Sequence, residues 1–208
     1  MFLKKLNIAY LGRRDYIDVS TLTSALYEAL PHLTDSAKIK NFNIKILRKV
    51  LNECNLWFAD DKKVKELVTL EFKKDVVAIF DWEYEGVTYF AFFKETNVPI
   101  TKRRNEIVDD PKELMFYERE TKNVVIFNPI NNDSIYNFMK MGRLIVVNKY
   151  NLFPRVVRAH FDCLYNQDEM KGIVMIGDFF AAKDFYKLET FKNGKKFGEI
   201  IIKSLQPY

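Results

Sequence analysis

The chain has 208 residues, of which 48% are hydrophobic, 15% aromatic and 29% charged, and its net charge is +5. This composition excludes a disordered or collagen-like chain, because it supplies enough apolar surface to bury a core. The length suits one large domain or two small ones. A small positive charge permits an acidic partner, nucleic acid included, without requiring one.

The first residues of the chain and its two cysteines indicate the cellular compartment in which the protein works. Residues 1–14 contain no apolar run of signal-peptide length, and no stretch approaches the ~20 apolar residues that span a bilayer. Cys54 and Cys163 lack the spacing of metal ligands, so we expect two free thiols. The sequence has no glycine-rich phosphate loop, no G-x-S-x-G and no H-E-x-x-H. We therefore predict a soluble cytoplasmic protein without a metal ion or cofactor.

The first elements along the chain are a strand and a helix. Residues 6–11, LNIAYL, predict the strand. Residues 18–32, DVSTLTSALYEALPH, predict a helix, and Asp18 or Ser20 can cap it by accepting a hydrogen bond from a backbone N–H. Its apolar residues recur at spacings of 3 and 4 and therefore face a core: Leu22, Ala25, Leu26, Ala29 and Leu30.

The next segment, KNFNIKILRKVLNECNLWFA (residues 40–59), allows two interpretations. Alternation of Phe42, Ile44 and Ile46 with more polar positions favours a strand. A helix from Leu47 to Cys54 is the rival, because apolar residues also recur there at helical spacing.

A hairpin is predicted at residues 80–94, after a further strand at residues 64–72. The first strand of the hairpin alternates aromatic with acidic residues, so that one face is apolar and the other polar. Glu85 and Gly86 supply the bend, where glycine tolerates a positive φ.

Residues 98–122 are polar and contain Pro99 and Pro111, and we expect them to form a linker. The order of elements then repeats. We predict a strand (123–127), a cap cluster (131–134) before an apolar helix (135–147), an alternating strand (155–165), and strands at 172–180, 184–191 and 195–203, the last two joined by a bend at Asn193-Gly194.

The spacing of matching elements predicts an internal duplication. The bend glycines Gly86 and Gly194 are 108 positions apart, and the helix-start residues Ser20 and Ser134 are 114 apart. The alternative is one α+β domain with two unrelated hairpins. A duplication divides the chain into a first unit (1–97), a linker (98–122) and a second unit (123–208).

The end of the chain, IGDFF…FYKLETFKNGKKFGEIII, is similar to the last strands of a hotdog unit, with a Gly-Asp entering a strand and a glycine-bent final hairpin. The order of one strand, one helix and four strands resembles the hotdog superfamily, and two such units resemble double-hotdog proteins. The resemblance implies an α+β fold of two similar halves. Each half would be an antiparallel sheet packed on one central helix, and the two sheets would face one another across a cleft.

The resemblance also implies a function. Hotdog proteins handle acyl thioesters of coenzyme A or acyl carrier protein, as thioesterases or dehydratases. The thioester would lie where the two units meet, near the helix starts, where unpaired N–H groups can polarise its carbonyl. A homo-oligomer is compatible with this architecture, and a membrane has no part in it.

Three residues are candidates for catalysis, two from the resemblance and one from its own strand pattern. Asp18 and Asp133 lie at the two predicted helix starts, although each is also explained as a cap. His160 lies two residues from Asp162 on a predicted strand, beside Arg158, so that the three face the same way. This trio is either an acid–base cluster or a solvated sheet face. Neither helix start carries the histidine that dehydratases of this type need, so binding without catalysis is an alternative.

Two functions of other classes stay open. Asp60 and Asp61, followed by Glu71-x-Lys73, match a loose Mg²⁺-dependent nuclease pattern, in which carboxylates hold the metal ion and the lysine stabilises phosphate charge. The basic charge also permits nucleic-acid binding. The third hypothesis is a non-enzymatic interaction protein, whose pocket is closed by some of its 18 phenylalanines.

Overall fold

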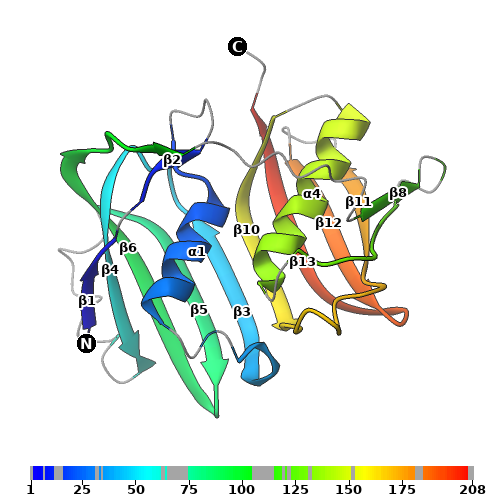
Figure 1. Ribbon diagram of the computed structural model, residues 1–208, viewed down its shortest axis with the longest axis horizontal. Helices are drawn as coiled ribbons and strands as arrows, with labels where there is room; N and C mark the ends of the chain where they lie inside the picture. Colours follow the sequence, from blue (N-terminus) through cyan, green and yellow to red (C-terminus); the bar gives the residue numbers. More distant parts are fainter. Residues whose placement is uncertain are drawn as a thin grey trace.

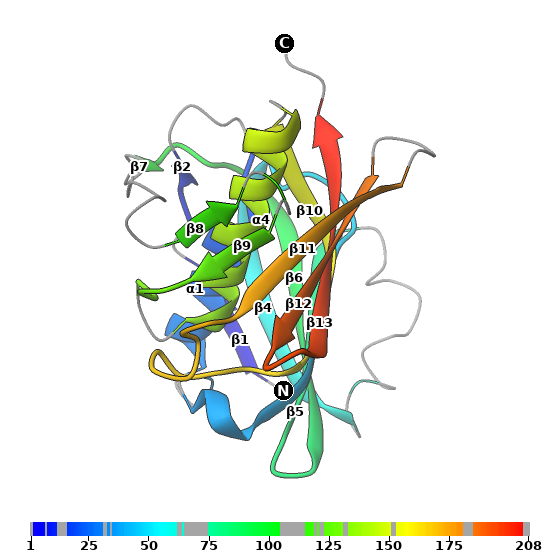
Figure 2. The same ribbon diagram turned by 90° about the vertical axis from the view of Figure 1, so that its right-hand side faces the viewer.

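The structure is a computed structural model with an α+β fold. An antiparallel sheet of eleven strands carries two α-helices on one face, α1 (Val19–Ala29) and α4 (Ser134–Tyr150) (Figures 1 and 2). The predicted α+β class, with antiparallel strands packed on two helices, is confirmed. The structure describes residues 2–6, 8–11, 16–30, 33, 35–61, 64, 75–104, 115–118, 120, 123–130, 133–150, 153–180 and 185–205.

The strands divide between two halves of the sheet. The first half contains β1 (Phe2–Lys5), β3 (Ile39–Ile46), β4 (Asn52–Asp60), β5 (Val76–Tyr84) and β6 (Val87–Pro99). The second half contains β8 (Met115–Glu118), β9 (Asn123–Ile126), β10 (Phe153–Cys163), β11 (Val174–Phe180), β12 (Phe185–Lys192) and β13 (Lys195–Leu205). A separate parallel pair is formed by β2 (Tyr10–Leu11) and β7 (Arg103–Arg104), and η2 (Ser36–Lys38) is a short 3-10 helix.

The two halves join edge to edge. β3 pairs with β10 in antiparallel register, with Phe42 opposite Phe161 and Ile44 opposite Ala159. The expectation of two sheets facing one another across a cleft is therefore wrong. Pairing β3 with β10 satisfies backbone groups that two separate sheets would leave on exposed edges, which explains why one continuous sheet forms.

The halves are alike in their elements but not in strand order. The pair of strands β3 and β10, where the halves join, is called the seam. Outward from it, the strand order is β3, β5, β6, β4, β1 in the first half and β10, β13, β12, β11, β9, β8 in the second. Three consecutive strands, β11 to β13, are neighbours in the second half. In the first half β6 lies between β4 and β5.

Both glycine-bent hairpins are present. Glu85 and Gly86 have φ values of 51° and 79°, and Asn193 and Gly194 have values of 51° and 75°. Two central residues with positive φ are the signature of the two-residue turn that matches the twist of antiparallel strands. β5–β6 and β12–β13 are therefore confirmed as local hairpins.

The core lies between the helices and the sheet. In the first half Trp82 is fully buried and stacks on Phe42, with ring centroids 6.0 Å apart, while Leu22 and Leu26 of α1 are fully buried. In the second half Phe138 of α4 packs on Phe161, with centroids 4.9 Å apart. The helical spacing of apolar residues in α1 therefore predicted its buried face correctly.

Several local predictions need correction. The rival helix from Leu47 to Cys54 is wrong, because β4 begins at Asn52 and residues 47–51 connect two strands. Of the strand predicted at residues 6–11, only Tyr10 and Leu11 form a strand, β2, and the preceding strand β1 ends at Lys5. The expected linker contributes β7 and β8. Residues 65–74, with most of the predicted strand at 64–72, lie outside the described residues.

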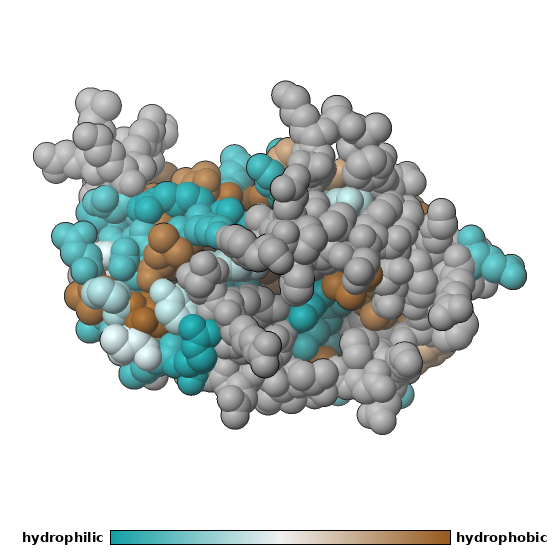
Figure 3. Space-filling view, turned by 90° about the horizontal axis from the view of Figure 1, so that it is seen from above, coloured by the Kyte–Doolittle hydropathy of each residue, from teal (hydrophilic) through white to brown (hydrophobic). Residues whose placement is uncertain are grey.

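The described surface is mixed in character. No described helix is long and apolar enough to cross a membrane. Seen from the end at the top of Figure 1, hydrophilic and hydrophobic residues are interspersed over the described part of the surface (Figure 3).

Candidate functional site

The start of α4 is a buried polar site. The Asp133 carboxylate accepts a hydrogen bond from the backbone N–H of Tyr136, with Oδ1 and N 2.9 Å apart, and a second from the N–H of Ile135. Asp133 is therefore the N-cap of this helix, as the sequence predicted. Its own carbonyl accepts hydrogen bonds from the backbone N–H and the side-chain amide of Asn137, at 3.1 and 2.8 Å.

Neighbouring side chains fix this helix start in place. Ser134 is fully buried, and its hydroxyl both donates to the carbonyl of Tyr165 and accepts from the N–H of Tyr165. The amide oxygen of Asn137, also fully buried, accepts from the N–H of Ile130 at 3.0 Å. The cap is thus anchored to the segment after β10 and to the segment before α4.

The environment of Asp133 makes its protonation state adjustable near neutral pH. Burial raises the pKa of this carboxyl to about 6, against the opposing effect of the N–H groups of Tyr136 and Ile135. A carboxyl that titrates in this range can accept a proton from a reacting group and return it.

Tyr27 of α1 adds a second buried group from the other half of the chain. Its hydroxyl is buried and has no hydrogen-bond partner within the described part of the structure. Burial and then the charge of Asp133 raise the pKa of Tyr27 well above its usual value, so the phenol stays protonated. α1 and α4 are in contact, which brings the two residues into one environment.

The sequence did not single out Tyr27. It lies between Leu26, on the buried face of α1, and Glu28, on the exposed face. A tyrosine at such a boundary usually packs its ring and keeps its hydroxyl in water. Burial of this hydroxyl depends on how α1 meets the rest of the molecule, and no local pattern shows that.

Asp18 caps α1. Its carboxylate accepts from the N–H of Thr21 at 2.9 Å and from the hydroxyl of Ser20 at 2.7 Å. Of the two predicted caps, Asp18 is therefore the one used. Asp18 and Asp133 lie at the starts of different helices, both on the helix-bearing face of the sheet.

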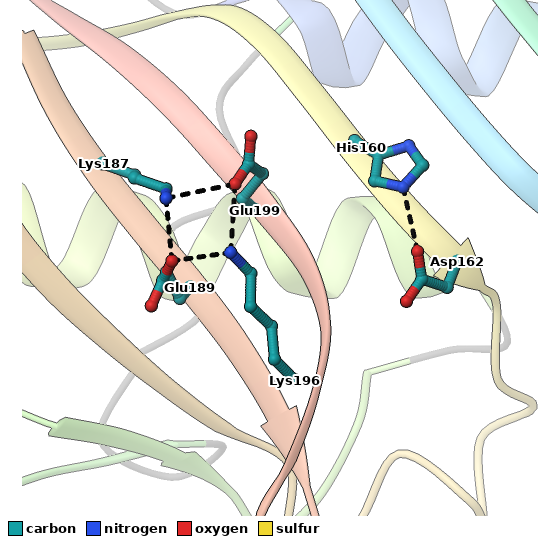
Figure 4. A network of polar contacts seen from close by, with 6 residues as sticks. All are labelled: His160, Asp162, Lys187, Glu189, Lys196 and Glu199. Atoms are coloured by element: carbon teal, nitrogen blue, oxygen red, sulfur yellow. Dashed lines mark hydrogen bonds and ion pairs between the residues drawn. The ribbon is translucent and has the colours of Figure 1, made fainter.

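His160 lies on the opposite face. Ala159 and Phe161 are buried towards the helices, so His160 and Asp162 project to the open side, as the alternation predicted. In Figure 4 α4 lies behind the strands that carry these side chains. The structure does not bring His160 together with the two capping aspartates.

On the open face, His160 belongs to a hydrogen-bonded chain of side chains across the seam. Its Nε2 lies 2.9 Å from Oδ1 of Asp162, and its Nδ1 lies 2.8 Å from Oδ1 of Asn43 on β3. The amide nitrogen of Asn43 donates to Asp81 of β5 and to the carbonyl of Asn41, which fixes its orientation. Both ring nitrogens of His160 therefore face acceptor oxygens, and a protonated imidazole can donate to both.

Beside this chain the open face carries a lattice of ion pairs. Lys187 and Lys196 each contact both Glu189 and Glu199, at N–O distances between 2.6 and 3.3 Å (Figure 4). All four side chains are partly exposed to solvent, so the pairs contribute little to stability individually. Within the lattice the two positive and two negative charges balance.

The remaining candidates from the sequence do not form a second site. Glu71 and Lys73 of the nuclease pattern lie outside the described residues. No group of three or more acidic, histidine or cysteine side chains suited to a metal ion occurs among the residues with described positions. Cys54 and Cys163 are free, as predicted. Burial raises the pKa of the Cys54 thiol to about 12, which makes it a poor nucleophile at neutral pH.

Comparisons with known proteins give likeness in structure alone. No protein-family model matches the chain, and no curated protein matches its sequence. A conserved protein with a hot dog fold from Alicyclobacillus acidocaldarius is similar over 100% of this chain and 94% of its own, with 10% identity and a TM-score of 0.46.

Two solved thioesterases are similar to the same degree. An acyl-ACP thioesterase from Bacteroides thetaiotaomicron covers 98% of this chain and 96% of its own, with 10% identity and a TM-score of 0.45. A 12:0-ACP thioesterase from Umbellularia californica has the same coverage, 7% identity and a TM-score of 0.46. The expected resemblance to hotdog proteins is thus found along the whole chain.

Proposed function

We propose that the protein hydrolyses an acyl thioester of coenzyme A or acyl carrier protein at the start of α4. The observation that carries this proposal is the Asp133 carboxyl, a helix cap whose burial raises its pKa to about 6. Thioester hydrolysis at neutral pH needs one group that takes a proton from water and then gives it to the leaving thiol. A carboxyl poised in this range can do both.

The proposed reaction has two steps, attack by water and collapse of the tetrahedral intermediate. A water oxygen attacks the thioester carbonyl carbon, and one proton of that water passes to the carboxylate of Asp133. The tetrahedral intermediate then collapses, its carbon–sulfur bond breaks, and the thiolate takes the proton back from Asp133. The products are a carboxylic acid and a free thiol, and the enzyme is unchanged.

We propose Asp133 rather than Asp18 or His160 as the group that transfers the proton. Both aspartates cap a helix, but Asp133 is the one whose pKa burial raises to about 6. Asp18 also accepts from the hydroxyl of Ser20. His160 lies on the open face, with the sheet between it and both helices. In this proposal Asp18 acts as a cap, and His160 stabilises the seam.

We also propose that the chain consists of two hotdog-like units, residues 1–97 and 123–208, joined by 98–122, and that it works in the cytoplasm. Each half has one helix on one face of its strands, which supports the division. The different strand orders are then a rearrangement within the first unit, in which β6 lies between β4 and β5.

The test is a panel of acyl-CoA and acyl carrier protein thioesters of different chain length, with release of free thiol measured for the wild type and two variants. Asp133→Asn keeps a good cap and removes the proton acceptor, so hydrolysis should fall by at least 100-fold. Asp18→Asn is the matched cap variant and should retain activity. No hydrolysis and no calorimetric binding of any panel member by the wild type would overturn the proposal.

A further inference from the structure

We propose that the hydroxyl of Tyr27 binds the carbonyl oxygen of the thioester, so that each chain holds one site, built from α1 of one half and α4 of the other. This inference rests on the function proposed above and adds the group that holds the substrate. It also fixes the number of sites.

The Tyr27 hydroxyl lacks a hydrogen-bond partner in the described part of the structure. The hydroxyl is buried, and within the described residues it has neither a hydrogen-bond acceptor nor a hydrogen-bond donor as its partner. Buried hydroxyls in native proteins nearly always have a partner, because leaving water without one is costly. A ligand oxygen that accepts a hydrogen bond would complete this group.

The backbone N–H groups at the start of α4 already have hydrogen-bond acceptors. A helix N-terminus usually offers free N–H groups to an anion or a carbonyl oxygen. Here the N–H groups of Ile135 and Tyr136 donate to the Asp133 carboxylate, and that of Asn137 donates to the Asp133 carbonyl. These three N–H groups are therefore already engaged and do not point to a substrate carbonyl near Asp133. Tyr27 is a protonated donor within electrostatic reach of Asp133.

The starts of α1 and α4 differ, and this difference sets the number of thioester sites in the chain. The carboxylate at the start of α1, Asp18, has hydrogen-bonded neighbours in Ser20 and Thr21. Within the described part of α4, no buried polar side-chain atom lacks a hydrogen-bond partner in the way that Tyr27 does. The arrangement around Asp133 is therefore not repeated at the start of α1, and the chain carries one site despite its two halves.

In the reaction, the Tyr27 hydroxyl would donate to the oxygen that becomes negatively charged when water attacks the carbonyl carbon. The hydrogen bond strengthens as the charge grows, so it lowers the barrier more than it tightens binding. The proton stays on Tyr27 throughout, because Asp133 carries out the proton transfer.

The test compares Tyr27→Phe with the wild type in thioester hydrolysis, using the best substrate of the panel. Loss of the donor should lower kcat by roughly 100-fold or more, with a smaller change in KM. The limb of the pH profile that belongs to Asp133 should stay. Tyr10→Phe is the control, because the Tyr10 hydroxyl donates to the carbonyl of Leu51, away from this site, and its kcat should be unchanged.

Folding and stoichiometry separate the possible failures. Tyr27→Phe should fold with an unchanged or higher Tm, since it loses a hydroxyl that has no hydrogen-bond partner among the described residues. Asp133→Asn, titrated with the same acyl-CoA in a calorimeter, should bind one molecule per chain. An active Tyr27→Phe variant, or a stoichiometry of two, would overturn this inference while leaving the proposed hydrolysis intact. A wild type that neither hydrolyses nor binds thioesters would overturn both.

Discussion

Asp133 has two roles that make opposite demands on its charge. As a cap it accepts N–H bonds at the positive end of a helix, which favours the carboxylate. As a buried group it has lost water, which favours the neutral acid. Burial prevails and raises the pKa of the carboxyl to about 6. The residue thus costs stability near neutral pH, which is consistent with the proton-transfer role proposed for it.

The pH dependence of stability tests this balance. The pKa of Asp133 rises from 3.8 to about 6 on folding, so the folded state binds the proton more tightly. Its contribution to stability is fully present below pH 3.8 and is lost as the pH rises through about 6. Urea unfolding should show that Asp133→Asn gains on the order of 2 kcal/mol over the wild type between pH 4.5 and pH 7.5.

Asp18→Asn is the matched substitution for this measurement, because it also replaces a capping carboxylate with an amide. If the free energies of unfolding of Asp133→Asn and the wild type change in parallel with pH, burial does not raise the pKa of the Asp133 carboxyl.

At the residue scale, the sequence could predict the two caps and little else of the site. Capping depends on residues within one helical turn, so Asp18 and Asp133 were visible from local pattern. The buried hydroxyl of Tyr27 and the raised pKa of Asp133 arise where α1 meets α4, more than 100 residues later in the chain. No local pattern reports such a meeting.

At the scale of elements, glycines set how closely backbones approach. A Cβ atom at Gly142 of α4 would lie 2.8 Å from a methyl carbon of Leu188, and one at Gly177 of β11 would lie 2.8 Å from a methyl carbon of Ile145. α4 therefore rests on the sheet at a distance that side chains at these positions would prevent. The sequence indicated both elements but not the close contact.

Two glycine substitutions separate crowding from backbone strain. A Cβ at Gly198 would meet Phe161, the carbonyl of His160 and the hydroxyl of Thr190, so Gly198→Ala should destabilise by roughly 2 to 3 kcal/mol. Gly86→Ala meets no atom within 4 Å but has a φ of +79°, so it should cost only about 1 kcal/mol. Equal midpoints in chemical denaturation would contradict the packing at Gly198.

The hairpins were predicted well and the strand order was not, for one reason. A two-residue turn is specified by its own residues, as at Asn193 and Gly194. The placing of β6 between β4 and β5 depends on contacts that span the whole half.

At the scale of the molecule, we expect the seam between β3 and β10 to make the halves one folding unit. Phe161 lies opposite Phe42 across β3 and β10, and it packs on Phe138 and Phe197 within the second half. Loss of either half would expose a long strand edge. The sequence pattern could not show this pairing, because edge strands pair through backbone groups that every residue carries.

Unfolding probes can follow each half. Both tryptophans, Trp57 and Trp82, lie in the first half, so their fluorescence reports on it alone, whereas far-ultraviolet circular dichroism reports on the whole chain. Phe161→Ala should destabilise by about 3 to 5 kcal/mol and lower both midpoints together. A tryptophan midpoint that stays in place would show that the halves unfold independently.

The central proposal is that Asp133 transfers a proton in thioester hydrolysis. The most direct measurement is the pH profile of kcat for thiol release from an acyl-CoA substrate, in the wild type and in Asp133→Asn. We predict a wild-type rate that rises with pH through a limb near pH 6, and its loss in the variant. Hydrolysis that is equal in the two proteins at every pH would contradict it.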